Sequence, residues 1–202
     1  MGNHLNHGTD DDAVLVNSWR EGDIDSFESL VRKHQRQMVN IAFRITGDYD
    51  DACEVAQDAF IAAYRGIASF KGASRFSTWL TSITINHSRN RLQQNMAKKK
   101  NEAYSLDGAQ GGAERVRNHE LHSSAPSALE QLERLDLHEK LQECIKALSL
   151  DFREVIVLRD IQDFPYGEIG EVLGLQEGTV KSRLHRAREM VRDCLKRAVG
   201  EL

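Results

Sequence analysis

Apolar residues recur every three to four positions along most of this chain, and only two prolines, Pro126 and Pro165, interrupt it. Proline ends helices because it lacks an amide hydrogen and clashes with the preceding turn, so long helices can form almost everywhere. No segment alternates apolar and polar residues as a half-buried strand does. The pattern therefore predicts an all-α fold of two small helical domains joined by a flexible linker.

The domain boundaries follow from changes in composition. Helices are expected at 11–21, from about residue 25 to Gly47, from about residue 50 to 67, and from 76 through Arg91. We assign 1–10 to a disordered N-terminus, 11–96 to the first domain and 128–202 to the second. Segment 97–127, rich in glycine, serine and charge, is interpreted as the linker. His119 and His122 lie in it and are interpreted as a solvated pair, because no further ligands are nearby.

Charge is segregated along the chain, although its net value is only −4. Residues 71–100 hold seven basic and no acidic residues, and 179–202 carry a net charge of +4, whereas the stretches before them are acidic. Two basic blocks favour two polyanion-facing surfaces over simple solvated faces. The first twenty residues show no secretory signal, and the three widely spaced cysteines are expected to be reduced thiols in a cytosol.

The strongest motif is a helix-turn-helix at 165–192, in the C-terminal domain. Pro165 suits the start of its first helix, Gly170 leaves room for the second helix to cross, and Gly174 permits a positive φ in the turn. Leu175 is expected to fill the turn. The second helix has a buried stripe, Val180, Leu184, Ala187 and Val191, and a basic opposite face that could enter a major groove.

Two motifs in order resemble one known family. GEIGEVLGLQEGTVKSRLHRARE is similar to region 4, the promoter-reading domain, of extracytoplasmic-function (ECF) sigma factors of the sigma-70 family. DACEVAQDAFIAAYRGIASF resembles region 2.2 of that family, and FKGASRFSTWLTSITINHSRNRLQQ resembles regions 2.3 and 2.4. The resemblance covers nearly all the chain after the first ten residues.

The resemblance implies three sets of site residues. Core RNA polymerase, through its β′ clamp helices, would contact Asp51, Glu54, Gln57, Asp58 and Phe60. The −10 element would be recognised and melted by Lys71, Gly72, Ser74, Arg75, Trp79, Asn86, Arg89 and Asn90. The −35 element would be read by Thr179, Lys181, Ser182, Arg183, His185, Arg186 and Arg188. Cys53, Ser82 and His185 depart from residues that are frequent at these positions in the family.

The resemblance also implies the partners and the location. They are bacterial core RNA polymerase (β′ clamp helices and β flap), promoter DNA, and an anti-sigma factor that can be membrane-bound. The chain would be cytoplasmic, nucleoid-associated when bound to polymerase, and tethered to the membrane when its anti-sigma factor is. No small-molecule substrate, cofactor, metal or catalytic residue is expected.

Two other classes of function remain open at this point. A stand-alone helix-turn-helix regulator would bind duplex DNA without polymerase, usually as a dimer. A metal-dependent nuclease would use the carboxylates between Asp48 and Asp58, but their helical spacing brings no companion ligands. The sequence thus predicts a non-enzymatic sigma factor.

Overall fold

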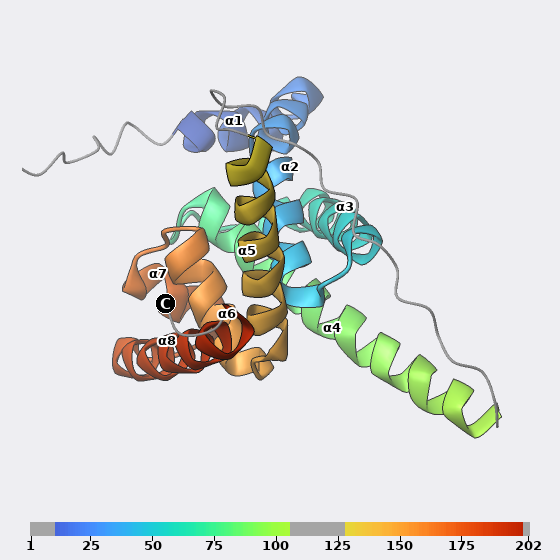
Figure 1. Ribbon diagram of the computed structural model, residues 1–202. Helices are drawn as coiled ribbons and strands as arrows, with labels where there is room; N and C mark the ends of the chain where they lie inside the picture. Colours follow the sequence, from blue (N-terminus) through green and yellow to red (C-terminus); the bar gives the residue numbers. More distant parts are fainter. Residues whose placement is uncertain (1–10, 106–127, 200–202) are drawn as a thin grey trace, which may run out of the picture.

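The computed structural model describes residues 11–105 and 128–199, and all of its regular elements are helical. The first half contains α1 (Asp11–Arg20), α2 (Ile24–Thr46), α3 (Tyr49–Gly66), a 3-10 turn η1 (Ile67–Ser69) and α4 (Phe76–Ser105). The second contains α5 (Ala128–Ala147), α6 (Leu150–Ile156), a π-helical turn η2 (Val157–Ile161), α7 (Tyr166–Leu173) and α8 (Glu177–Val199). The predicted all-α class with a C-terminal helix-turn-helix is confirmed (Figure 1).

Local capping explains where the helices of the first half begin and end. The Asp23 carboxylate accepts a hydrogen bond from the Asp25 amide at the start of α2, and Asp48 accepts one from the Asp51 amide at the start of α3. Gly47 ends α2 in the left-handed region, with φ of 76°. The predicted ends of this long helix are therefore correct to within a residue or two.

Three helices, α2, α3 and α4, form the core of the first half, and α1 lies across them. Its largest fully buried side chains are Leu30, Met38, Ile41, Ile45, Phe76, Leu80 and Ile85. Two residues of the predicted apolar stripes behave differently: Ile24 is 65 % exposed and Tyr64 is 47 % exposed. Ile24 opens α2 and Tyr64 faces a groove, so neither meets a packing partner on that side.

The helix-turn-helix consists of α7, the turn and α8. Gly174 ends α7 with φ of 68°, and the four predicted stripe residues of α8 are all buried. The role predicted for Gly170 needs correction. A Cβ at this position would lie 2.7 Å from the carbonyl oxygen of Leu175, so the close approach is to the backbone of the turn and not to α8.

A disulfide joins Cys144 of α5 to Cys194 of α8, with 5.7 Å between the two Cα atoms. The expectation of three reduced thiols is therefore wrong for this pair, and Cys53 alone among the three is free. Sequence spacing could not reveal the pair, because fifty residues separate the two cysteines and only the packing of α5 on α8 brings them together.

The two halves pack against each other and share one continuous hydrophobic core. In Figure 1, α5 lies alongside α2, and α7 approaches the start of α4. Helix α4 continues to Ser105, into the segment predicted as linker, because neither glycine nor proline occurs between Gly72 and Gly108 to stop it. Residues 1–10, 106–127 and 200–202, with His119 and His122, lie outside the described residues. Within 11–105 and 128–199, no helix combines the length and apolarity that a bilayer span requires.

Candidate nucleic-acid and protein-binding surfaces

The exposed face of α8 carries the residues predicted to read the −35 element. Val180, Leu184, Ala187 and Val191 anchor the helix, so the residues between them point outward. Lys181, Ser182, His185, Arg186 and Arg188 are exposed, and Thr179 and Arg183 are half-buried. The structure therefore places the whole predicted set along the first three turns of one helix.

Several cations on this face are held by neighbouring acids. Lys181 pairs with Glu177 at 2.5 Å, and its ammonium lies 5.4 Å from the centre of the Tyr166 ring. The hydrogen bond with Glu177 raises the pKa of Lys181 above its ordinary value. Arg188 makes two hydrogen bonds to Asp160, at 2.8 and 2.6 Å. These pairs position the long side chains over the turn before DNA arrives.

The loop before α4 carries the first part of the predicted −10 surface. Lys71 and Gly72 are exposed, and Gly72 adopts φ of 71° with open space around it. Trp79 is half-buried, with its ring centre 5.0 Å from that of Phe70 and 5.9 Å from that of Phe76. Phe76 is 1 % exposed and belongs to the core, whereas Trp79 lies at the edge of the loop.

The second part of the −10 surface lies on α4 itself, and the other half of the molecule covers part of it. Asn86 and Asn90 are exposed. Arg89, between them, makes two hydrogen bonds to the Glu154 carboxylate of α6, at 2.6 and 2.7 Å. Arg75 lies 3.3 Å from the Glu168 carboxylate of α7.

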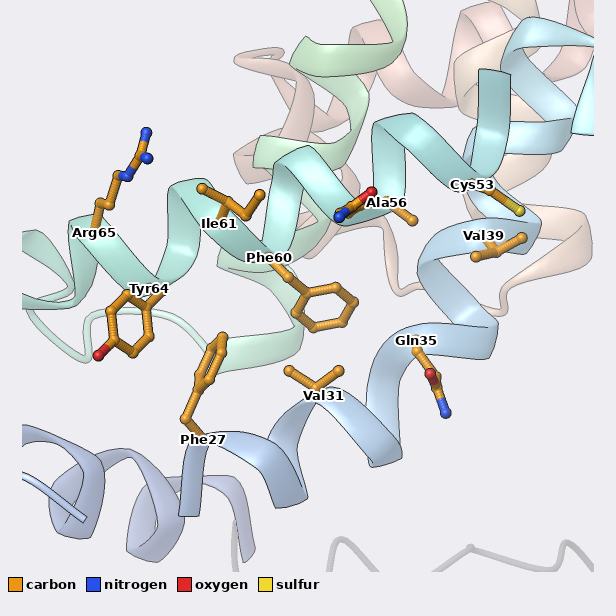
Figure 2. A pocket seen from close by; sticks show the side chains of 11 residues that line it. Phe27, Val31, Gln35, Val39, Cys53, Ala56, Phe60, Ile61, Tyr64 and Arg65 are labelled. Atoms are coloured by element: carbon orange, nitrogen blue, oxygen red, sulfur yellow. The ribbon is translucent and has the colours of Figure 1, made fainter. Parts of the chain in front are cut away.

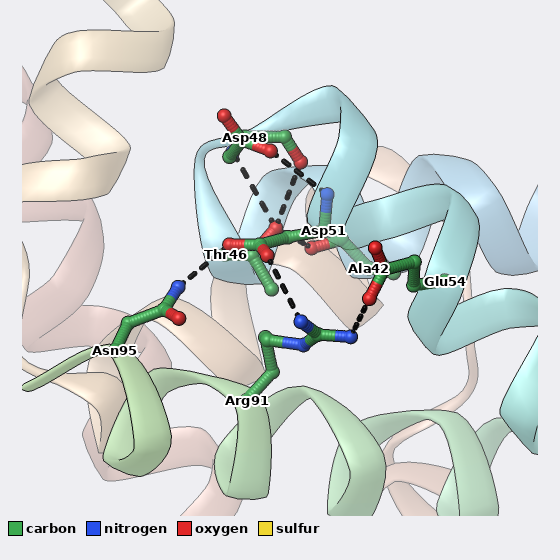
Figure 3. Close-up of polar contacts among 7 residues, drawn as sticks. All are labelled: Ala42, Thr46, Asp48, Asp51, Glu54, Arg91 and Asn95. Atoms are coloured by element: carbon green, nitrogen blue, oxygen red, sulfur yellow. Dashed lines mark hydrogen bonds and ion pairs between the residues drawn. The ribbon is translucent and has the colours of Figure 1, made fainter. Parts of the chain in front are cut away.

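The acidic residues predicted to bind polymerase do not form one free face. Asp51 accepts a hydrogen bond from Asn95 at 2.7 Å and lies 3.5 Å from Arg91, which also contacts Glu54 (Figure 3). Arg91 and Asn95 both come from α4, so this helix partly neutralises the start of α3. Asp58 is exposed further along α3.

Gln57 and Phe60 face a different feature, a groove of about 660 Å³ between α2 and α3. Figure 2 shows Phe27, Val31 and Phe60 at its centre and Tyr64 at one end. The groove is mostly apolar, and the exposed side chains of Ile61 and Tyr64 border it. Sequence reasoning found Gln57 and Phe60 but missed the α2 wall. The signal was present, since Phe27, Val31 and Val39 lie beside the buried stripe of α2.

Sequence reasoning also missed Glu154 and Glu168, the acids that contact the predicted −10 arginines. Neither residue belongs to a recognisable motif, and the nearer pair is 65 residues apart. No group of three or more His, Cys, Asp or Glu residues in the described part of the chain is placed to hold a metal ion. The arrangement offers basic and amide groups for nucleic acid and an apolar groove for protein.

Comparisons with known proteins agree with this arrangement. The family Sigma-70 region 2 matches residues 30–97, and the family Sigma-70, region 4 matches residues 138–191. The ECF RNA polymerase sigma factor SigW of Bacillus subtilis (strain 168) is 34 % identical over 178 residues, covering 88 % of this chain and 92 % of SigW. The ECF RNA polymerase sigma-E factor of Escherichia coli (strain K12) is 33 % identical and covers 89 % and 92 %.

Solved structures show the same fold. CnrH, in complex with the cytosolic domain of CnrY, has a TM-score of 0.65 at 24 % identity, covering 92 % of this chain and 97 % of CnrH. The sigma factor RpoE of Bartonella quintana, in complex with the anti-sigma factor NepR, has a TM-score of 0.62 at 25 % identity and covers 84 % and 96 %. The fold and surfaces define a two-part helical transcription factor. The chain belongs to the ECF sigma factors of the sigma-70 family.

Proposed function

We propose that this protein binds core RNA polymerase and directs it to promoters by reading a −35 and a −10 element and helping to melt the DNA. The observation that carries the proposal is that one chain presents two distinct basic surfaces, on α4 and on α8, together with an apolar groove. Tethering both surfaces to one polymerase makes the second DNA contact effectively intramolecular, so neither needs to bind strongly alone.

Helix α8 reads the −35 element in the major groove. Its exposed Lys181, Ser182, His185 and Arg186 can bond base edges, while Arg183 and Arg188 neutralise phosphates beside them. Tyr166 and Glu177 support this role, because they hold Lys181 near the start of the helix, which is the end that enters the groove.

Helix α4 and its preceding loop bind the −10 element as a separated strand. Asn86, Arg89 and Asn90 supply amide and guanidinium groups, and Lys71 and Arg75 supply phosphate contacts. The open backbone at Gly72 and the adjacent Trp79 ring support a pocket for a flipped base at this loop. A preformed pocket offsets the unstacking of that base, which costs about a few kcal/mol.

Polymerase binds the α2–α3 side of the first half. An amphipathic helix pair such as the β′ clamp helices would place apolar residues in the groove against Phe60 and Gln57. Basic residues flanking the inserted face would meet Asp58, Glu54 and Asp51 at its border. The β flap would contact the second half. The chemistry of transcription then belongs to the polymerase.

An anti-sigma factor completes the set of proposed partners. RpoE of Bartonella quintana was solved with such a partner, and its fold covers most of this chain. The same groove and the faces of both halves are open to a masking protein. We place the protein in the cytoplasm, nucleoid-associated on polymerase and membrane-tethered when its anti-sigma factor is.

Permanganate footprinting separates this function from that of a stand-alone regulator. Permanganate oxidises unpaired thymines, so it reports melting directly. The proposal predicts reactive thymines in the −10 element only when this protein and core polymerase are both present. Tight binding to duplex DNA without polymerase, with no reactive thymines in the complete mixture, would instead identify a stand-alone regulator.

A further inference from the structure

Two arginines that we assign to promoter DNA are bound by carboxylates of the other half. Arg89 donates two hydrogen bonds to Glu154 in a bidentate pair. Glu168 contacts Arg75 at 3.3 Å and accepts a hydrogen bond from Thr78 at 2.6 Å. A guanidinium binds a carboxylate and a phosphate with the same fork of donors, so Glu154 occupies the place of a backbone phosphate.

Glu154 depends on this contact. Its residue is 1 % exposed, and its side-chain hydrogen bonds within the described chain go to Arg89. The same hydrogen bonds raise the pKa of Arg89. A buried carboxylate is stable only when it is paired, because water no longer solvates it. Arg89 therefore cannot leave for DNA unless Glu154 is exposed to water, which requires α6 to move away from α4.

The rest of the interface between the halves is polar and incompletely satisfied. Arg44 donates to Gln142 at 2.6 Å and Gln162 donates to Asn40 at 2.9 Å. Three buried side-chain nitrogens at this interface have no hydrogen-bond partner: Arg44 Nε, Gln142 Nε2 and Arg153 Nε. Burial also lowers the pKa of Arg44 and of Arg153, as expected for desolvated guanidiniums. Polar interfaces with such defects open more readily than apolar ones.

Geometry makes opening necessary for promoter reading. The −10 and −35 elements lie about 25 base pairs apart by their nominal positions, or about 85 Å at roughly 3.4 Å per base pair. In this structure α6 and α7 of the second half are in contact with α4, so the two reading surfaces are neighbours. The Cys144–Cys194 disulfide fixes α5 to α8, so the second half can move as one unit.

We propose that this packed arrangement is an autoinhibited state, in which Glu154 and Glu168 act as an internal substitute for DNA phosphates on α4. The inference rests on the proposed role of α4 as a DNA-binding face. The second half blocks the cations of that face until the halves separate. The contact suppresses binding of the free chain to nucleic acid and leaves it available to polymerase.

The test measures binding of single-stranded DNA without polymerase. The probe is a fluorescein-labelled 15-nucleotide single strand of mixed sequence, followed by anisotropy with the full chain. Glu154→Gln combined with Glu168→Gln removes both blocking charges and leaves every proposed DNA contact intact. The matched control is Glu143→Gln with Glu171→Gln, two exposed glutamates of the same half whose loss changes the net charge equally.

We expect the E154Q/E168Q protein to bind the strand at least tenfold more tightly than the parent, while the control changes less than twofold. Small-angle X-ray scattering should show a larger radius of gyration for E154Q/E168Q alone. If its gain in affinity is no greater than that of the control, the proposal is wrong. Thermal denaturation checks that it folds, and Glu168→Gln alone, at a half-exposed position, should still raise affinity about threefold.

Run-off transcription with core polymerase separates this proposal from the proposed function. A sigma factor without the internal block would give transcripts but no gain in strand binding by E154Q/E168Q. A blocked DNA-binding protein that is not a sigma factor would show the gain in strand binding and no transcripts.

Discussion

At the scale of single residues, buried charges organise this molecule. Arg153 donates hydrogen bonds to the carbonyl oxygen of Ile45, at the end of α2, and to those of Lys146 and Leu148, at the end of α5. One guanidinium therefore caps two helices from different halves, a task that suits its rigid set of five donors. Asp12 performs a similar task in the first half, where it holds α1 on α2.

The contact of Asp12 predicts a pH dependence of stability. Burial raises the pKa of Asp12, but hydrogen bonds with His34 (2.8 Å) and Lys33 (2.7 Å) outweigh it, so the pKa lies below its ordinary value. A depressed carboxyl pKa stabilises the fold above the unfolded pKa of about 3.9, and this stabilisation is lost as the pH falls through the folded value. The difference in unfolding free energy between the parent and Asp12→Asn should be largest near neutral pH and shrink below about pH 4. Urea titrations across this range measure it, and a difference that grows on acidification would contradict the assignment.

At the scale of elements, the helix-turn-helix owes its geometry to its turn. The amide of Leu175 donates to the carbonyl of Gly170 at 2.9 Å, and the turn backbone lies where a Cβ on Gly170 would be. Gly167, one turn earlier on the same helix, has open space around it. Two glycines of one short helix thus differ in what they permit.

This contrast gives a matched pair of substitutions. Gly167→Ala should leave stability unchanged or raise it by about 0.5–1 kcal/mol, because alanine favours helix without meeting a neighbour. Gly170→Ala should destabilise the second half by about 1–3 kcal/mol and weaken −35 binding, because the turn must shift. Thermal melts followed by circular dichroism report the first quantity and duplex binding reports the second. Equal effects of the two substitutions would refute this account of the turn.

The disulfide links two elements and predicts a redox-dependent stability. It closes a loop of about fifty residues, which the chain-entropy model equates with about 4 kcal/mol. Reduction, or Cys144→Ser with Cys194→Ser, should lower the unfolding free energy of the second half by an amount of that order. Cys53→Ser is the control, since Cys53 is a free thiol in the other half. Equal denaturation curves with and without reductant would show that the bond does not form in solution.

At the scale of the whole molecule, sequence and structure differ in what they reveal. Local signals placed the helices well, because caps such as Asp23 and Gly47 act on neighbouring residues. The exposed face of α8 was predictable for the same reason, since its buried stripe defines the opposite side. The pairs Arg89–Glu154 and Cys144–Cys194 were not, because they depend on how the halves pack and no local pattern encodes that packing. The sequence thus predicted two separate domains, whereas the structure holds them together.

The central claim, bipartite promoter reading on polymerase, is tested most directly by run-off transcription. Core polymerase and this protein are mixed with a promoter library whose −35 and −10 elements vary independently. We predict transcripts that require the protein and both elements, and a loss of −35 discrimination by about tenfold or more with Arg186→Ala, consistent with about 1–3 kcal/mol for a base contact. Arg192→Ala, exposed further along α8, should retain it. Transcripts that ignore either element, or an absence of transcripts from a protein that binds core, would contradict the account.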